Sequence, residues 1–368
     1  MAKHLVFAGG GHAHLTSLMN IGDFRRRGYR VTVITPSPYQ YYSGMGPGML
    51  SGLYGPEEIR FDIQKMVEKR DGNFIQEPIV RVDPEERVLF LGSGKTIPYD
   101  VVSFGTGSTI PVENLIVKKS ERVFTVKPVA NLVHARERIL ELIEKEIPRL
   151  LVVGGGPSAL EISVNAWKLV RDHGGKSNIT IIAGTRFLSP FPAKVRSLAL
   201  ESLNKRGIEV REGVHVTAIQ GETAILEDGR SQPFDIAFLG TGVKPSGLFQ
   251  DSGLPAGEDG GLLVNTYLQS VGYSDIFGGG DCICFQQGPL DKVGVYAVRQ
   301  NPILYHNLLA ALEGGALQEF DPGGAYMLLF NMGDGRAIYH KKGRIFHGRI
   351  PFLLKNWIDK KFMRKFKE

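Results

Sequence analysis

The chain has 368 residues, of which 42% are hydrophobic and 22% are charged, enough for a large core and more than one domain. It contains no run of about 18 uncharged apolar residues, so we expect no transmembrane helix. The net charge is +6, but residues 341–368 hold ten Lys or Arg against two acidic residues. The basic charge therefore lies at the C-terminal end and not over the body.

The first predicted element is a buried strand, LVFA (5–8), that leads directly into a glycine-rich turn. An apolar-periodic helix and a second β-branched run, VTVI (31–34), follow, which is the β–α–β pattern of a parallel sheet. The turn, Gly9 to Gly11, opens a helix whose free N–H groups and positive dipole end suit a pyrophosphate. The strand begins so early that we expect no signal peptide.

Two histidines follow this turn. A dinucleotide-binding turn normally has a third glycine where this chain has His14, because the helix and the strand pack closely there. We expect His14 to hydrogen-bond buried backbone, and His12 is placed to donate to a phosphate. Neither histidine has a further His or carboxylate at ligand spacing, so no metal site is predicted.

The chain then repeats itself. LLVVGGGPSAL (150–160) resembles LVFAGGGHAHL (5–15), ITIIAGTR (179–186) resembles VTVITPSP (31–38), and DIAFLGTGVKPS (235–246) resembles DVVSFGTGSTIP (100–111). Three similarities in the same order indicate two copies of one unit. We predict an α/β fold with two Rossmann-like dinucleotide-binding domains and a short C-terminal region. The alternative is an α/β protein with glycine-rich turns and no ligand.

The chain has two cysteines, Cys282 and Cys284. They are too close in sequence for a normal disulfide and lack the other ligands of a zinc site. This usage is typical of a reducing compartment.

Two distant segments carry a family resemblance. SDIFGGGDC (274–282), together with SFGTGS (103–108), resembles the second FAD fingerprint of the pyridine-nucleotide disulfide oxidoreductase superfamily. The resemblance implies FAD as cofactor, NADH or NADPH as co-substrate, and contact of Asp281 with a ribityl hydroxyl of FAD. It also implies an FAD-binding domain over 1–115 and 245–325, an inserted NAD(P)-binding domain over 116–244, and a C-terminal region over 326–368.

Within the superfamily the chain is most similar to type II NADH dehydrogenases and to the dehydrogenase-like domain fused to selenophosphate synthetase. The similar segments are GGGHAHL (9–15), YYSGMGPGMLSGLY (41–54), VYAVRQNPIL (295–304) and the C-terminal end. In type II dehydrogenases the segment matching VYAVRQ lies against the flavin and helps to line the quinone pocket. Segments 41–50 and 295–300 would thus form the route of the acceptor, although Tyr41, Tyr42 and the methionines could equally be core.

The resemblance also implies catalytic residues. Arg299, Gln300 and Tyr296 would lie beside the flavin, unless this is an ordinary helix N-terminus packed on the sheet. Glu161, one turn after the second set of glycines, would point between flavin and nicotinamide. The alternative is that Glu161 pairs with a nearby lysine such as Lys127.

The candidate site residues follow from the turns and the resemblance together. For catalysis they are Glu161, Arg299 and Gln300. For FAD they are Gly9, Gly11, His12, Ala13, Thr35, Pro36, Thr106, Gly107, Gly280, Asp281, Tyr296 and Ala297. For NAD(P) they are Gly154, Gly156, Pro157, Ser158, Arg186 and Gly242.

Two departures from the family pattern narrow the chemistry. No cysteine pair lies near SGMGPGML (43–50), where a disulfide reductase would need one, so we expect direct hydride transfer without a redox disulfide. The acidic ribose anchors are also missing, with Thr35 and Ala183 at the two positions. Arg186 beside Ala183 favours NADPH, or a weak preference, or a degraded site. A solvated loop cation is the alternative.

The C-terminal segment from Pro351 onward predicts a helix with Leu354, Ile358, Phe362 and Phe366 at i, i+4 spacing among many cations. This composition is typical of a helix at a membrane interface. The alternative is a helix docked on the protein's own body or on the mate in a homodimer. Nucleic acid is not expected, because no recognition fold accompanies the charge.

Together these features predict an FAD-dependent oxidoreductase that takes a hydride from NAD(P)H and passes electrons to a quinone or another small acceptor. We expect a cytoplasmic protein, peripheral on the inner face of the cell membrane. The alternatives are a reductase of a soluble or protein acceptor, which could belong to selenium metabolism, and an enzyme resembling sulfide:quinone reductase. A non-catalytic flavin-binding partner is a further alternative.

Overall fold

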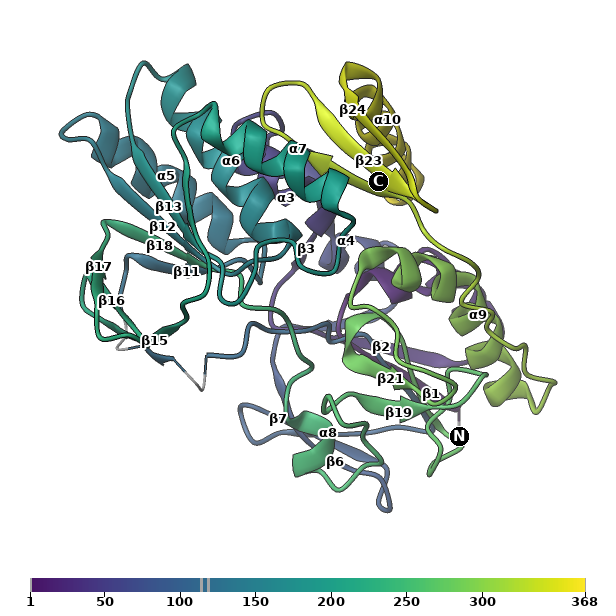
Figure 1. The fold of residues 1–368 in the computed structure, drawn as a ribbon. Helices are drawn as coiled ribbons and strands as arrows, with labels where there is room; N and C mark the ends of the chain where they lie inside the picture. The colour runs from purple at the N-terminus through teal and green to yellow at the C-terminus, as the bar shows by residue number, and fades with distance from the viewer. Residues whose placement is uncertain (1, 113–114, 118–119, 368) are drawn as a thin grey trace.

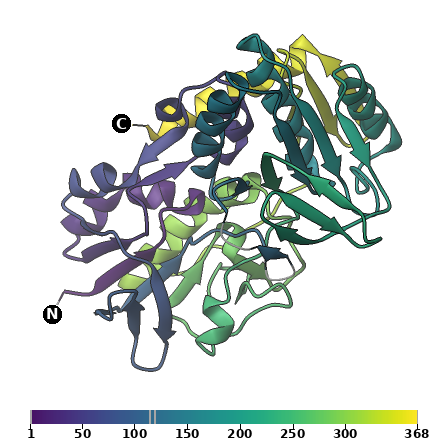
Figure 2. The same ribbon diagram turned by 90° about the vertical axis from the view of Figure 1, so that its left-hand side faces the viewer.

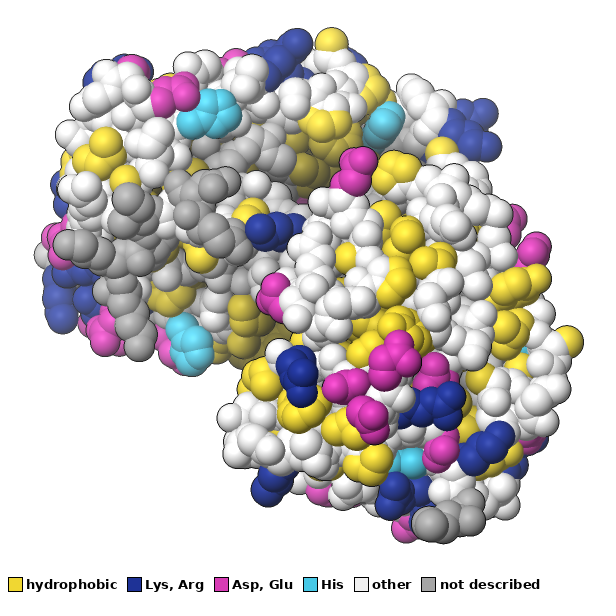
Figure 3. Space-filling model, turned by 90° about the horizontal axis from the view of Figure 1, so that it is seen from below, with side chains coloured by type: hydrophobic (Ala, Val, Ile, Leu, Met, Phe, Trp, Pro, Cys, Tyr) yellow, Lys and Arg dark blue, Asp and Glu magenta, His cyan; other side chains and the backbone are white. Residues whose placement is uncertain are grey.

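A computed structural model describes residues 2–112, 115–117 and 120–367. The described chain forms two lobes and a C-terminal region that lies across them (Figures 1 and 2). Seen from below, the lobes meet at a notch with hydrophobic side chains along its wall, and charges of both signs are scattered over this face (Figure 3). None of the described helices is long and apolar enough to cross a membrane.

The first lobe is built on a five-stranded parallel sheet with the strand order β20-β9-β1-β2-β5. β1 is fully buried and reads HLVFA, which is why a run of apolar residues rather than an alternating pattern marks it. The strands are β1 (His4–Ala8), β2 (Arg30–Ile34), β5 (Asn73–Ile75), β9 (Val101–Phe104) and β20 (Ile276–Gly278).

The second lobe repeats this arrangement with the order β11-β18-β12-β13-β14. In both sheets the strand before the glycine turn is central, with its two sequence-related partners on either side. The strands are β11 (Val123–Thr125), β12 (Arg149–Val153), β13 (Asn178–Ile182), β14 (Glu209–Arg211) and β18 (Ile236–Leu239). The predicted α/β fold with two Rossmann-like domains is confirmed, and we keep the predicted domain boundaries as a proposal.

Each lobe also carries a smaller, largely antiparallel sheet, whose hairpins come just before β9 in the first lobe and β18 in the second. In the first lobe this sheet holds β6 (Ile79–Asp83), β7 (Val88–Leu91) and β8 (Thr96–Pro98). In the second lobe it holds β10 (Ile116–Val117), β15 (Val216–Gln220), β16 (Thr223–Leu226) and β17 (Ser231–Pro233).

The helices cover the sheets. They are α1 (Leu15–Met19), α2 (Ile21–Arg26), α3 (Gly46–Leu50), α4 (Ile63–Glu68), α5 (Asn131–Ile143), α6 (Pro157–Asp172), α7 (Ala193–Asn204), α8 (Leu248–Asp251), α9 (Gly294–Glu313) and α10 (Arg349–Phe366). Short 3-10 turns in the described residues are η1 (His12–His14), η2 (Ser43–Met45), η3 (Pro56–Ile59) and η4 (Gly280–Cys282). The remaining strands are β3 (Tyr39–Tyr41), β4 (Arg60–Asp62), β19 (Leu262–Val264), β21 (Ile283–Phe285), β22 (Leu328–Asn331), β23 (Ala337–Lys341) and β24 (Arg344–Gly348).

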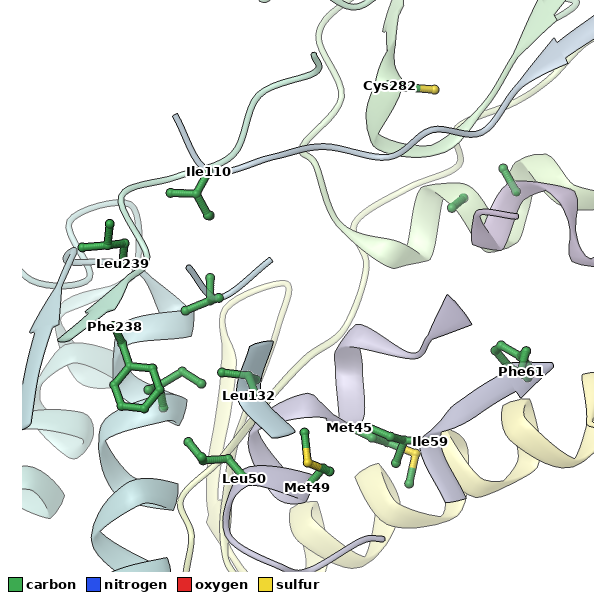
Figure 4. Close-up of a cluster of buried hydrophobic side chains, with 14 of the residues drawn as sticks. Met45, Met49, Leu50, Ile59, Phe61, Ile110, Leu132, Phe238, Leu239 and Cys282 are labelled. Carbon is green, nitrogen blue, oxygen red and sulfur yellow. The ribbon is translucent and has the colours of Figure 1, made fainter. Parts of the chain in front are cut away.

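The segment predicted as a route for the acceptor instead begins a packed wedge between the lobes. η2 and α3 bury Met45 and Met49, and α3 packs on α5 and α6 of the second lobe. Figure 4 shows Met49 and Leu50 beside Leu132 of α5, and Met45 beside Ile59. Gly48 has no room for a side chain, since an added Cβ would lie 2.6 Å from the Tyr54 ring. The alternative that the methionines are core is confirmed.

The C-terminal region joins both lobes. The hairpin of β22 and β23 lies on α6, where a Cβ on Gly333 would come within 2.5 Å of the Val164 carbonyl oxygen. Arg206 after α7 holds the hairpin turn through the Met332 carbonyl (3.0 Å). α10 then runs back over the first lobe (Figure 2), where Asn356 accepts a hydrogen bond from Tyr54 at 3.0 Å.

Candidate functional site

The first glycine turn is shaped by contact with one carbonyl group. Gly9 has φ +95°, and a Cβ on Gly9 or Gly11 would lie 2.6 or 2.4 Å from the Gly105 oxygen at the end of β9. The Gly11 N–H donates to the same oxygen at 3.2 Å. Only glycine fits, and the bare backbone makes a cradle of the kind that a pyrophosphate occupies. The turn therefore fits the diphosphate of FAD.

His14 is fully buried behind this cradle. Its Nδ1–H donates to the Gly9 carbonyl at 2.7 Å, and its Nε2 accepts from the Ser103 hydroxyl at 2.8 Å. Because a carbonyl can only accept, the proton of the neutral ring lies on Nδ1. Burial lowers the pKa of His14 to about 4. The expected hydrogen bond to buried backbone is confirmed, and the ring finds room because residue 105 is glycine, whose Cβ would meet it at 2.7 Å.

His12 lies on the other side of the turn in an aromatic pocket. Its ring centroid is 5.5 Å from that of Tyr42, 6.4 Å from Phe61 and 6.0 Å from Phe362 of α10. Burial lowers its pKa to about 4, so the ring is neutral. The Nε2 atom is buried without a hydrogen-bond partner, a group that a bound ligand would be expected to satisfy. This orphaned nitrogen is a second feature that fits FAD, and phosphate contact by His12 stays a prediction.

Asp281 on η4 is held by two partners. Its Oδ2 accepts from Ser108 Oγ at 2.8 Å and from Lys127 Nζ at 2.5 Å. Burial raises the pKa of Asp281, but the charge of Lys127 and the hydrogen bonds from Lys127 and Ser108 together lower it, and the net direction is downward. Lys127 follows β11 of the second lobe, so this ion pair joins the two lobes. The alternative in which Lys127 pairs with Glu161 is wrong, and the role of Lys127 beside Asp281 was missed by sequence reasoning.

The start of α9 closes on both turns of the first lobe. The Gln300 side-chain oxygen accepts from the Gly280 N–H at 2.6 Å. Asn301, which sequence reasoning missed, donates to the His12 carbonyl and accepts from the Thr16 N–H, both at 2.7 Å. Gly279 permits this close packing, since an added Cβ there would lie 2.6 Å from a Leu304 methyl and 2.9 Å from the Ala13 methyl. The sequence signal that could have pointed to Asn301 is the polar pair Gln300–Asn301 inside an otherwise mostly apolar helix.

Arg299 and Tyr296 turn toward a different segment. Arg299 donates to the carbonyls of Pro322 and Gly324. Tyr296 packs edge-on against Tyr326 at 5.6 Å. These contacts position the chain as it leaves α9, and a catalytic role for Arg299 or Gln300 stays a prediction.

Glu161 on α6 is buried beneath the C-terminal region. Its Oε1 accepts from the Asn331 N–H at 2.7 Å. Burial raises the pKa of Glu161 to about 7, while the Lys355 ammonium lowers it and the Asp359 carboxylate raises it. The side chain can therefore hold or release a proton near neutral pH, and its place beside a nicotinamide stays a prediction.

A polar network from α10 lies next to Glu161 and was not foreseen. Lys355 donates to the Gly44 carbonyl and to Asp359, both at 2.7 Å. The Tyr42 hydroxyl donates to the other oxygen of Asp359 at 3.1 Å. Burial, and then the Asp359 carboxylate, raise the pKa of Tyr42 well above its usual value. This network fixes α10 on the segment that follows β3.

The second glycine turn repeats the geometry of the first. Gly154 has φ +135°, and its Cβ would lie 2.2 Å from the Gly240 oxygen. A Cβ on Gly155 would lie 2.4 Å from the Ala183 oxygen, whereas Gly156 faces open space. Pro157 then begins α6, which leaves Gly156 as its N-cap. This turn fits the diphosphate of NAD(P), with Ser158 in the first turn of α6.

The two strand ends that would meet the ribose hydroxyls hold no carboxylate. Thr35 after β2 is nearly buried and donates its N–H to the Ile75 carbonyl at 3.1 Å. Ala183 after β13 is buried, and Thr185 and Arg186 beyond it are exposed. The remaining candidates stay predictions: Pro36 follows β2, Thr106 and Gly107 follow β9, Gly242 follows β18, and Ala297 lies on α9.

The cysteines are both free thiols. Cys282 is buried against the carbonyls of Phe104 (3.5 Å) and Gly279 (3.3 Å), and burial raises its pKa. A buried thiol with a raised pKa is a poor nucleophile. No group of three or more His, Cys, Asp or Glu is arranged for a metal ion within the described ranges.

The C-terminal helix shows a different outward face from the one predicted. Phe366 is buried and Phe362 packs against His12 and Tyr42, so these two members of the predicted ladder point toward the protein. Leu354 and Ile358 are half-buried. Phe362 and Phe366 were wrong as part of a membrane face, because α10 uses them to dock on the protein's own body, which was the alternative. The exposed apolar residues are instead Ile350 (80%), Leu353 (61%) and Trp357 (57%).

Comparison with known proteins agrees with this geometry. Residues 3–307 match the pyridine nucleotide-disulphide oxidoreductase family. Ferroptosis suppressor protein 1 of Taeniopygia guttata is 26% identical over 304 residues, which are 77% of this chain and 78% of that protein. The mitochondrial external alternative NAD(P)H-ubiquinone oxidoreductase B1 of Solanum tuberosum is 23% identical over 302 residues, 70% of this chain and 52% of that protein.

Among solved structures, the sulfide:quinone oxidoreductase of Aquifex aeolicus superposes with a TM-score of 0.80 at 18% identity, over 100% of this chain and 92% of that one. This likeness shows the fold. The family match covers both glycine turns, the Asp281 turn and most of α9. The chain therefore belongs to the pyridine nucleotide-disulphide oxidoreductase family and is an oxidoreductase that works with FAD and NAD(P)H.

Proposed function

We propose that this protein is an NAD(P)H:quinone oxidoreductase that works at a membrane surface. The observation that carries the proposal is the pair of glycine cradles on two joined lobes, with Lys127 of one lobe bound to Asp281 of the other at 2.5 Å. FAD, when bound, supplies the two-electron chemistry between the nucleotide and the acceptor. Overall, NAD(P)H, a quinone and one proton give NAD(P)⁺ and a quinol.

The chain's own residues supply position and proton handling. The cradles hold the diphosphates, and Gln300 and Asn301 fix the two turns of the first lobe relative to each other. Quinol formation needs a proton that NAD(P)H does not provide. Glu161, with a pKa of about 7, is the buried group best suited to hold that proton.

A quinone acceptor is supported by the absence of thiol chemistry in the described site and by the names of relatives. Cys282 is buried with a raised pKa, and Cys284 lies two residues away on β21. The Solanum tuberosum relative is named for ubiquinone, and the Aquifex aeolicus structure for sulfide and quinone. Because Cys282 is buried, we favour reduction of a quinone by NAD(P)H over oxidation of sulfide for this chain.

Membrane contact is supported by the outward face of α10. Ile350, Leu353 and Trp357 follow i, i+3, i+7 spacing and are all exposed. Lys361 lies over the Trp357 ring at 5.0 Å, and further cations flank the stripe. An exposed aromatic and aliphatic stripe among cations suits the boundary of an anionic bilayer. We place the protein on the inner face of the cell membrane.

Anaerobic rapid mixing tests the proposal. NADH or NADPH should bleach the absorbance of oxidised flavin, and a soluble ubiquinone analogue should restore it. The Gly11→Ala variant, which should lack flavin, is the control. Flavin that stays oxidised with both nucleotides would contradict the enzyme proposal. Flavin that is reduced but returns no faster with quinone than with buffer would contradict the quinone acceptor.

A further inference from the structure

We propose that the second nucleotide site selects NADPH over NADH, and that Arg186 and the Thr185–His215 pair bind the 2′-phosphate of the adenosine ribose. The inference rests on the proposed function and names the co-substrate of that same site. It depends on the end of β13, where the loop 183–188 passes the second glycine turn.

The loop lies directly against the diphosphate cradle. The Leu188 N–H donates to the Gly155 carbonyl at 2.7 Å, and a Cβ on Gly155 would be 3.1 Å from the Arg186 oxygen. A nucleotide whose diphosphate lies on the Gly154–Gly156 turn has its adenosine ribose near the end of the following strand. Arg186 is thus three residues beyond Ala183, the strand end where the ribose is expected.

No carboxylate is available there for a ribose diol. Ala183 holds the position that an acidic residue takes in NADH-specific sites. Two carboxylates lie nearby among the described residues. Glu227 accepts from the His215 N–H at 3.0 Å through Oε1, and Glu212 is also engaged. Its Oε1 accepts from the Phe187 N–H at 2.6 Å, and both of its oxygens accept from Arg196 at 2.8 and 2.7 Å.

Donors for a phosphate are available instead. Arg186 is exposed, and its charge is one of the causes that lower the pKa of Glu212, whose oxygens are held by Arg196 and the Phe187 N–H. A guanidinium binds phosphate through two parallel N–H groups. The site therefore offers an exposed cation for the phosphate, beside carboxylates that already have hydrogen-bond partners.

His215 reaches the same loop from the connection between β14 and β15. The Gly213 N–H donates to the Gly184 carbonyl at 2.7 Å, which ties the two loops together. Thr185 Oγ1 and His215 Nε2 are 3.3 Å apart. A Cβ on Gly184 would meet the His215 ring at 2.8 Å, so glycine there makes room for the ring. With Nε2–H donating to Thr185, the threonine hydroxyl keeps its own proton for a phosphate oxygen.

Calorimetric titration of the holoenzyme with adenosine 2′,5′-bisphosphate and with adenosine 5′-phosphate tests this inference. We expect the bisphosphate to bind at least tenfold more tightly. Arg186→Ala should remove most of that difference and leave 5′-phosphate binding within about twofold. His215→Ala should remove a smaller part. Arg230→Ala, an exposed arginine in the turn between β16 and β17, should change neither affinity.

Equal binding of the two nucleotides by the unaltered protein would overturn the inference, as would an equal loss for both in Arg186→Ala. The ratio of kcat/KM for NADPH to that for NADH should fall at least tenfold in Arg186→Ala and further with Ala183→Asp. If the 2′-phosphate preference appears but neither nucleotide reduces the flavin, the inference stands and the proposed function falls. If both nucleotides reduce the flavin with equal efficiency, the function stands and the inference falls.

Discussion

The two glycine turns share one backbone design but differ in their surroundings. At each turn the first glycine presses on the carbonyl of an equivalent strand end, Gly105 or Gly240. The first turn is enclosed by His12, by α9 and, through Phe362, by α10. At the second turn Gly156 faces open space. The first is built to retain its ligand and the second to exchange it, as a resident cofactor and a co-substrate require.

The largest expected effect comes from adding one methyl group to each turn. Gly11→Ala places a Cβ 2.4 Å from the Gly105 oxygen, so the turn must open and flavin should be lost. Gly156→Ala meets nothing within 4 Å, so flavin should be retained and only the KM for the nucleotide should change, by a few fold. The ratio of flavin absorbance to protein absorbance after purification measures the first effect. Full flavin occupancy in Gly11→Ala would contradict the difference that we draw between the two glycine turns.

A second expected effect is on stability and concerns Glu161, which follows the exchangeable turn. Its folded-state pKa of about 7 is raised by burial. The stability that the protonated carboxyl contributes is thus present below about pH 4.5 and is lost as pH rises through about 7. Relative to Glu161→Gln, the wild type should lose about 3 kcal/mol of unfolding free energy over this range.

Urea unfolding of both proteins at pH 5 and pH 8 measures this difference. Gln keeps an oxygen that accepts from the Asn331 N–H, so the variant is expected to fold. Parallel pH profiles for the two proteins would mean that Glu161 is not the group that titrates near neutral pH.

A third, smaller effect concerns α10, which covers the first glycine turn and which we propose also contacts lipid. Trp357→Ala should weaken sedimentation with anionic liposomes roughly tenfold, because an aromatic ring contributes about 1.5–3 kcal/mol on burial. Ile147→Ser removes an exposed apolar residue of the second lobe and should leave sedimentation unchanged. Flavin content should be unaltered in both variants. Equal sedimentation of Trp357→Ala and the wild type would count against the membrane face of α10.

The smallest effect is expected at the thiols. Cys284→Ser should leave quinone-dependent turnover within about twofold, since neither turn uses sulfur. Cys282→Ala should cost about 1 kcal/mol of stability through lost packing, with turnover likewise retained. Steady-state kinetics and thermal unfolding measure the two quantities. A large loss of turnover in either variant would restore the alternative that resembles sulfide:quinone reductase.

Much of the fold was predictable because its signals are local. The glycines at 9, 11 and 154 are demanded by positive φ or close approach to a carbonyl, and their repetition marked the two domains. The pair Lys127–Asp281 was not predictable, since 154 residues separate its members and only the assembled lobes bring them together. α10 was half predictable. Helical periodicity indicated which residues of α10 share a face. Leu353 and Phe362 are both apolar, however, and only the docking of α10 on the first lobe decides that Phe362 is covered and Leu353 is exposed.

His14 and Gly105 share one space: the His14 ring fills the volume that a side chain at position 105 would otherwise occupy. The ring lies where most turns of this kind have a glycine, and the space that it needs is given up on the neighbouring strand end. A chain with glycine at position 14 leaves a void at position 105 that a side chain there would fill. The two positions should therefore change together among related chains, so that a lone substitution at either one leaves a cavity or a clash.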